Sequence, residues 1–188
     1  HASCIIDYAK SKSDQAVVKL SHCLESGARI KPVETLMRYR DLWCRCPNCQ
    51  QFYNGSLSIS IATAFVGMTS SFHETDFRWI VSQINLGTVY FRTDHSIEAA
   101  REIFTRVRPI VSGLMVRAYG QFAIVAPFFR PMFAIEVTNS LANVEESCKR
   151  YREAQEVVES YLEMIGPNDE AYEMMPWIEE VMPLTRSI

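Results

Sequence analysis

Three closely spaced cysteines in the stretch "YRDLWCRCPNCQQFY" are the residues whose types and spacing best suit chemistry. Cys46 and Cys49 form a C-x-x-C pair that has Pro47 between them. A tight turn of this kind aims two thiolates at one point about 2.3 Å from a zinc ion, and turn amides can donate hydrogen bonds to the sulfurs. A redox pair requires a thioredoxin-like βαβ setting, which the surrounding pattern does not indicate. The spacing therefore favours zinc over redox chemistry.

Further zinc ligands must come from elsewhere, because one C-x-x-C pair supplies two of the four that a structural zinc ion needs. The first residues, His1 and Cys4, have H-x-x-C spacing, which also suits metal ligation. Cys44, His22 and Cys23 are alternative ligands. The predicted zinc ligands are His1, Cys4, Cys46 and Cys49.

The even number of cysteines, six, is also compatible with three disulfides in a secreted protein. Their uneven spacing favours free thiols, and Cys148 lies in an amphipathic helical pattern, where a buried thiol is common. We therefore expect an intracellular, cytoplasmic protein. The first residue is His rather than Met, and no charged and apolar targeting segment follows it, so we expect a processed chain or a fragment.

The composition excludes several classes of protein. The 188 residues are 48% hydrophobic and 22% charged, which is ordinary for a soluble globular protein. The formal charge of −3 and the scattered basic residues argue against a nucleic-acid partner. No run reaches the roughly 18 apolar residues that a membrane span needs. The common phosphate, dinucleotide, zincin and hydrolase motifs are absent from the sequence, which argues against an enzyme.

The periodicity of apolar residues predicts an all-α fold. Residues 1–55 have an irregular pattern, whereas helical spacing begins at Leu57 and continues in four or more segments. Alternating Ser and Ile over residues 56–61 also fits a strand. A second helix is expected to start near His73, where acidic residues would face the positive end of the helix dipole. Pro109 is expected to end or kink a third helix that begins near Ser96.

Two stretches of this helical region, residues 85–104 and 140–159, resemble each other. They match at Leu86 and Leu141, at Gly87 and Ala142, and at Ala99 and Ala154. A leucine followed by a small residue lets a second helix approach closely, and the later alanine marks the contact. The second stretch has Glu145 where the first has Tyr90. The arrangement resembles tetratricopeptide (TPR) repeats, helix-turn-helix units of about 34 residues, and implies a curved array that binds a protein or peptide partner.

The N-terminal segment resembles the second half of a RING-type zinc finger of the RING-CH variety. "HASC" matches the H-x-x-C that precedes a helix in that family, and "CPNC" matches its closing C-x-x-C. The resemblance implies that His1 and Cys4 are the fifth and sixth ligands, and Cys46 and Cys49 the seventh and eighth. It also implies a ubiquitin-conjugating enzyme as a partner of the intact protein. A finger followed by helical repeats resembles a layout of algal and other protist proteins.

These patterns together predict two parts, a partial RING-like zinc-binding segment at residues 1–55 and a TPR-like helical repeat domain at residues 56–188. The leading hypothesis for the function is a protein-protein interaction scaffold rather than an enzyme. The alternative is a fragment of a RING-type ubiquitin ligase, whose activity would require the missing upstream ligands.

Overall fold

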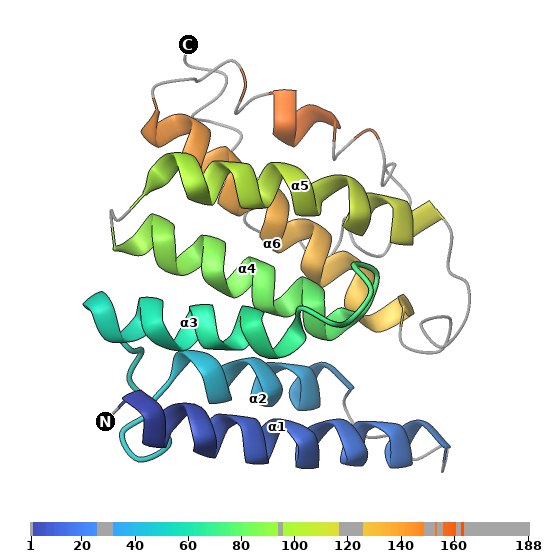
Figure 1. Cartoon of the computed structure of the whole chain (residues 1–188). Coiled ribbons are helices and arrows are strands. Elements are labelled where there is room, and N and C mark those ends of the chain that lie inside the picture. The colour runs from blue at the N-terminus through green and yellow to red at the C-terminus, as the bar shows by residue number, and fades with distance from the viewer. Residues whose placement is uncertain are drawn as a thin grey trace.

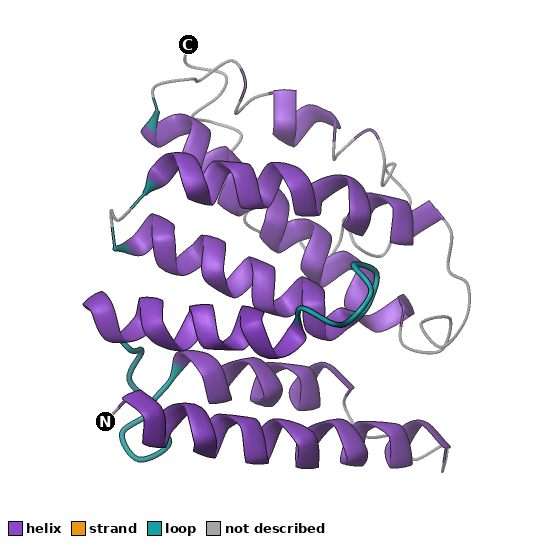
Figure 2. Ribbon diagram, viewed as in Figure 1, coloured by secondary structure: helices purple, strands orange, loops and turns teal. Residues whose placement is uncertain are grey.

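The computed structural model describes residues 2–25, 32–93, 96–116 and 126–148, and beyond them residues 153, 156–160 and 163. Within these ranges the structure has six labelled helices and no β-strand, apart from an isolated bridge between Arg45 and Phe52 (Figure 2). The predicted all-α class is therefore confirmed for this part of the chain. The helices are α1 (Ala2–Glu25), α2 (Pro32–Cys44), α3 (Gly55–Thr69), α4 (Phe77–Arg92), α5 (Ile97–Val116) and α6 (Ala126–Ser147).

The irregular pattern of residues 1–55 predicted no regular element, but the structure has α1 and α2 over most of this segment. The buried face of α1 is marked by small residues. Ala9 is completely buried, and the Ser13 hydroxyl accepts a hydrogen bond of 2.8 Å from Nε1 of Trp43 on α2. Small and hydroxylated residues do not produce the stripe of large apolar side chains by which an amphipathic helix is recognised.

The helices expected after residue 56 are largely confirmed, and α3 excludes the strand alternative for residues 56–61. α4 starts at Phe77 rather than near His73, because Asp76 is its N-cap and accepts a 2.9 Å hydrogen bond from the backbone N–H of Arg78. α5 continues through Pro109 to Val116, so of the two predicted outcomes, an end or a kink, the helix end is wrong. Pro109 is exposed to solvent, where water can satisfy the carbonyl that loses its intrahelical donor.

Consecutive helices lie side by side, and α6 crosses behind α4 and α5 (Figure 1). α6 also reaches α2, where Arg40 Nη2 lies 2.6 Å from Glu136 Oε1. The core includes Trp43, which stacks on Phe65 of α3 with ring centroids 4.5 Å apart. The predicted boundary at residue 55 coincides with the first residue of α3, so this stack joins side chains from both predicted parts. Among the described helices, none combines the length and apolar character needed to cross a membrane.

The small residue expected at a close helix contact is Gly87 on α4. A Cβ atom added there would lie 2.7 Å from Cζ of Phe104 on α5, closer than real side chains allow. The alanine buried on α5 is Ala100 rather than the predicted Ala99, which is half-buried. In the second stretch Glu145 is buried and forms a 2.6 Å ion pair with Arg101 of α5. The remaining predicted contact, Ala154, lies outside the described residues.

Candidate functional site

The C-x-x-C pair lies in the loop of residues 45–54 that joins α2 to α3. The backbone N–H of Cys46 donates to the carbonyl oxygen of Gln51, and the N–H of Gln50 donates to that of Cys46, both at 2.9 Å. The N–H of Tyr53 donates to the carbonyl of Cys44, also at 2.9 Å. These bonds close the loop into a tight hairpin, so its shape is fixed by the chain itself.

The turn within this hairpin has one unusual backbone position. Residues 47–49 form the turn, and Pro47 suits its second position because the ring fixes φ near −65°. Gln50, directly after the second cysteine, has a φ of 59°, in the left-handed region that favours glycine or asparagine. Its side-chain amide Nε2 donates a 2.9 Å hydrogen bond to the carbonyl oxygen of Pro47. This bond holds the glutamine in a conformation that it would otherwise avoid.

The surroundings of Cys46 favour its thiolate. The backbone N–H groups of Cys49 and Asn48 point at the sulfur and, with the Cys49 thiol, lower the pKa of Cys46 below its usual value. Amide donors around a sulfur stabilise the negative charge that a metal-bound cysteine carries. The turn therefore presents the donor arrangement that the sequence predicted for a zinc ligand pair.

Cys44, the nearest alternative ligand, has a structural role. Its thiol donates a 2.9 Å hydrogen bond to Oδ1 of Asn85 on α4. Burial raises the pKa of Cys44 to about 11, against the opposing effect of the nearby Arg40 guanidinium. The thiol therefore stays protonated near neutral pH, whereas Cys46 and Cys49 remain accessible at the turn.

The predicted zinc ligands are partly located by the structure. Cys4 is exposed on α1, Cys46 is half-buried and Cys49 is exposed, while His1 lies outside the described residues. None of these three cysteines forms a disulfide. Among the described residues, no group of three or more His, Cys, Asp or Glu side chains is close enough to hold a metal ion. The structure thus supplies one close pair of ligands, Cys46 and Cys49.

The N-terminal end of α1 lies at the same end of the molecule as this turn (Figure 1). Burial raises the pKa of Tyr53, and the nearby Cys46, Cys49 and Tyr8 raise it further. Tyr8 is therefore within electrostatic range of Tyr53, which lies in the same loop as the turn. Cys4 precedes Tyr8 by one helical turn on α1, so the two share one face of that helix.

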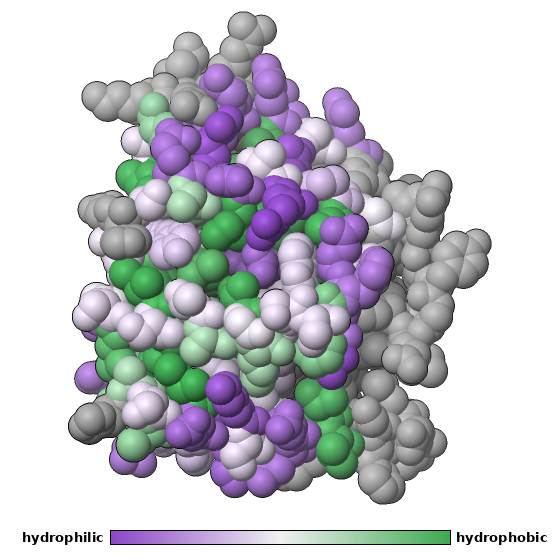
Figure 3. Space-filling model, in the orientation of Figure 1, coloured by the Kyte–Doolittle hydropathy of each residue, from purple (hydrophilic) through white to green (hydrophobic). Residues whose placement is uncertain are grey.

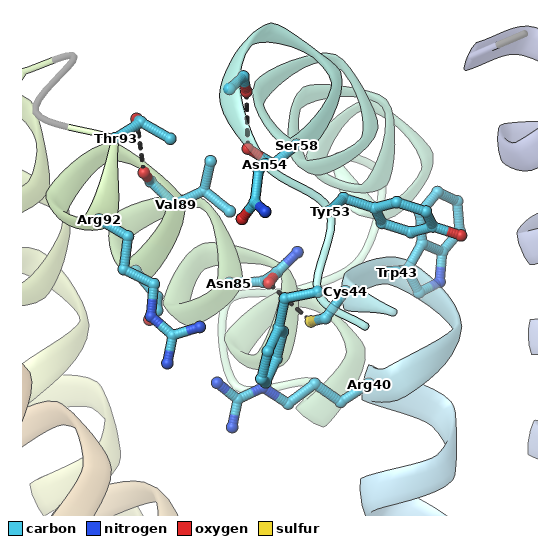
Figure 4. Close-up of a pocket in the computed structure, with 13 residues that line it drawn as sticks. Arg40, Trp43, Cys44, Tyr53, Asn54, Ser58, Asn85, Val89, Arg92 and Thr93 are labelled. Atoms are coloured by element: carbon cyan, nitrogen blue, oxygen red, sulfur yellow. Dashed lines mark hydrogen bonds between the residues drawn. The ribbon is translucent and has the colours of Figure 1, made fainter. Parts of the chain in front are cut away.

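The last part of the same loop, residues 52–54, lines a pocket of about 210 Å³ (Figure 4). The pocket lies between the last turn of α2, the first turn of α3 and the second half of α4. No motif in the sequence pointed to these residues, since they come from segments far apart in the chain. One local signal was present: Asn85 is one of three polar residues, with Ser82 and Gln83, that α4 buries. The polar lining includes Arg40, Asn54, Ser58, Asn85, Thr88, Arg92 and Thr93.

Comparison with known proteins gives no relative from which a function could be transferred. No protein-family model, no curated protein and no solved structure matches the chain. The resemblances to RING-CH fingers and to TPR repeats therefore stay predictions, and the function is proposed from the geometry of the described residues.

Proposed function

We propose that this chain is a protein-binding module built on stacked helix pairs of the TPR type, and that its partner binds at the end that carries the C-x-x-C turn. Two large apolar side chains are exposed there, Tyr8 at 41% and Phe52 at 41%. The guanidinium carbon of Arg45 lies 3.9 Å from the centroid of the Phe52 ring. Aromatic residues and arginine are the types most enriched in protein interfaces.

The packing of the helices supports this choice of surface. The close approach of α4 and α5 at Gly87 is the contact expected between the two helices of one repeat. α6, however, is tied back to α2 by the ion pair between Arg40 and Glu136, which occupies surface that an open array would leave free. On the face shown in Figure 3, apolar side chains of the described residues appear in separate groups among polar ones. The exposed aromatics beside the turn are therefore the better candidates for partner contacts.

We also propose that Cys46 and Cys49 bind one zinc ion. Cys4 and His1, the other predicted ligands, would have to approach the turn when the ion binds, because the described residues bring no three such side chains together. The observation that carries this proposal is the pair of backbone N–H groups, from Cys49 and Asn48, that already stabilise the Cys46 thiolate. The ion would cross-link the loop to the first turn of α1 and hold the exposed aromatics rigidly. A ubiquitin ligase role would require further ligands upstream of His1, and it stays a prediction about a longer protein.

The zinc proposal predicts one bound ion per chain. Replacing both turn cysteines in Cys46→Ser/Cys49→Ser should abolish binding, because the variant lacks both thiolates of the proposed C-x-x-C site. Affinity should fall as the pH is lowered, since each thiolate must be deprotonated to bind. Isothermal titration calorimetry, and the charge-transfer absorbance of a cobalt-substituted sample, would measure both effects.

The matched control for this prediction is Cys44→Ser. Cys44 lies only two positions from the turn, but its thiol is hydrogen-bonded to Asn85 and does not belong to the ligand pair. Stoichiometry and affinity for zinc should therefore be preserved in this variant. Unchanged zinc stoichiometry in the double variant would refute the assignment.

The partner proposal predicts that Phe52→Ala loses protein binding while the fold is kept. A truncated aromatic anchor typically costs about 2 kcal/mol or more of binding free energy, which is about thirtyfold in affinity. Val18→Ala is the control, because Val18 is 64% exposed on α1 but lies away from the turn. Affinity capture from the native source with both variants, followed by quantitative mass spectrometry, would compare the proteins retained. Equal retention by Phe52→Ala and the unmodified chain would contradict the proposal.

A further inference from the structure

Two arginines line the pocket beside the loop, and one of them is not paired with a described carboxylate. Arg40 and Arg92 contribute to the lining, which contains no Asp or Glu. The charge of Arg40 is offset by Glu136 on α6, at 2.6 Å. Arg92 forms no ion pair with any described residue, and its guanidinium carbon lies 4.8 Å from the centroid of the Phe52 ring. The pocket therefore has one arginine whose charge is not balanced by the protein.

A second observation places an unused donor in the same pocket. Asn85 is only 2% exposed, and its Oδ1 is occupied by the hydrogen bond from Cys44. Its Nδ2 is buried and has no hydrogen-bond partner among the described residues. Figure 4 shows this amide group at the centre of the pocket, with the nitrogen turned away from Cys44. Buried amide groups are nearly always hydrogen-bonded, so an unpaired one suggests an acceptor supplied by a ligand.

The start of α3 adds further donors. Asn54 is the N-cap of α3, and its side chain makes no capping hydrogen bond. The hydroxyl of Ser58 donates back to the carbonyl of Gly55, at 2.7 Å, so it does not cap the helix either. All three residues line the pocket. A helix N-terminus with uncapped N–H groups carries partial positive charge and favours anions.

We infer that this pocket binds a small oxyanion, supplied either by the carboxylate of a small molecule or by inorganic phosphate. Arg92 would provide the charge, Nδ2 of Asn85 a directed hydrogen bond, and the first N–H groups of α3 the remaining donors. The volume of about 210 Å³ is below the range of about 300–1,000 Å³ usual for drug-sized ligands, so the pocket suits a smaller ligand. The inference does not depend on zinc binding, and it shares Phe52 with the proposed partner surface.

The inference can be tested by titrating the full ¹⁵N-labelled chain with sodium phosphate or sodium acetate, with sodium chloride at equal ionic strength as the reference. Saturable shifts are expected in the NMR signals of the Asn85 side-chain amide and the Gly55 N–H. Arg92→Gln should weaken binding about tenfold, the effect of losing one charged hydrogen bond. The anion that binds with the higher affinity shows whether the pocket prefers phosphate or a carboxylate.

Two further variants make the outcome decisive. Arg45→Gln is the matched control, because Arg45 also lies over the Phe52 ring but does not line the pocket, and it should change the affinity less than about twofold. Asn85→Asp keeps an acceptor for Cys44 and replaces the amide donor with a carboxylate, so it should abolish binding. If Asn85→Asp does not fold, the anion affinities of Arg92→Gln and Arg45→Gln are compared instead, and a larger loss of affinity in Arg92→Gln would support the inference. Absence of saturable shifts, equal shifts with chloride, or equal weakening by both arginine variants would overturn the inference.

Discussion

Trp43→Ala is expected to lower the free energy of unfolding by about 3–5 kcal/mol, the usual cost of truncating a buried aromatic side chain. Trp43 is 1% exposed and is among the largest fully buried side chains of the described residues. Its ring stacks on Phe65 of α3 with an interplanar angle of 2°. Its indole N–H donates to Ser13 of α1. One side chain thus joins three helices, and its removal leaves a cavity where they meet.

Urea unfolding followed by far-ultraviolet circular dichroism would measure this loss. Trp43→Phe is the control, because it keeps an aromatic ring against Phe65 but loses the hydrogen bond to Ser13 and some volume. It should cost less, about 1–2 kcal/mol.

The same unfolding curves test the predicted division of the chain into two parts at residue 55. A single transition that shifts as a whole indicates one cooperative core, whereas two transitions would indicate separate domains. A loss below about 1 kcal/mol in Trp43→Ala would contradict the packing described.

Gly87→Ala is expected to lower the free energy of unfolding by about 2–3 kcal/mol, although alanine normally stabilises a helix. The new methyl group would lie 2.7 Å from Cζ and 2.9 Å from Cε1 of Phe104. Phe104 is completely buried, so its ring cannot move aside without disturbing other core residues. α4 and α5 must therefore separate, or the ring must leave its preferred rotamer.

The control is the same substitution at Gly67, which is also helical but has nothing within 4 Å of an added Cβ atom. Gly67→Ala should raise the stability by about 0.5–1 kcal/mol, because alanine loses less backbone entropy on folding. Thermal and urea unfolding of both variants would therefore shift in opposite directions. Shifts of the same sign would show that α4 and α5 do not approach closely at Gly87.

The parts of the fold that the sequence predicted are those determined by local pattern. α3, α4 and α5 carry large apolar residues at helical spacing. Asp76 begins α4 because a carboxylate can accept a hydrogen bond from the N–H groups of the first turn. α1 was missed because Ala9 and Ser13, its most deeply buried described residues, are small and mark a buried face only when Trp43 of α2 packs on it. Pro109 was expected to end or kink the helix, and the end was wrong because water can donate to the exposed carbonyl that proline, having no N–H, leaves without a donor.

The candidate site also has one feature that depends on local sequence and another that depends on how the helices pack. The C-x-x-C turn could be predicted from the sequence, because its geometry depends on Pro47 and on hydrogen bonds between residues a few positions apart. The grouping of Arg40, Asn85 and Arg92 around one pocket could not be predicted, since these residues lie on two helices that are far apart in the sequence. Local hydrogen bonds are specified by near neighbours in the chain. The convergence of distant donors follows from how α2, α3 and α4 pack, and no short stretch of sequence encodes that.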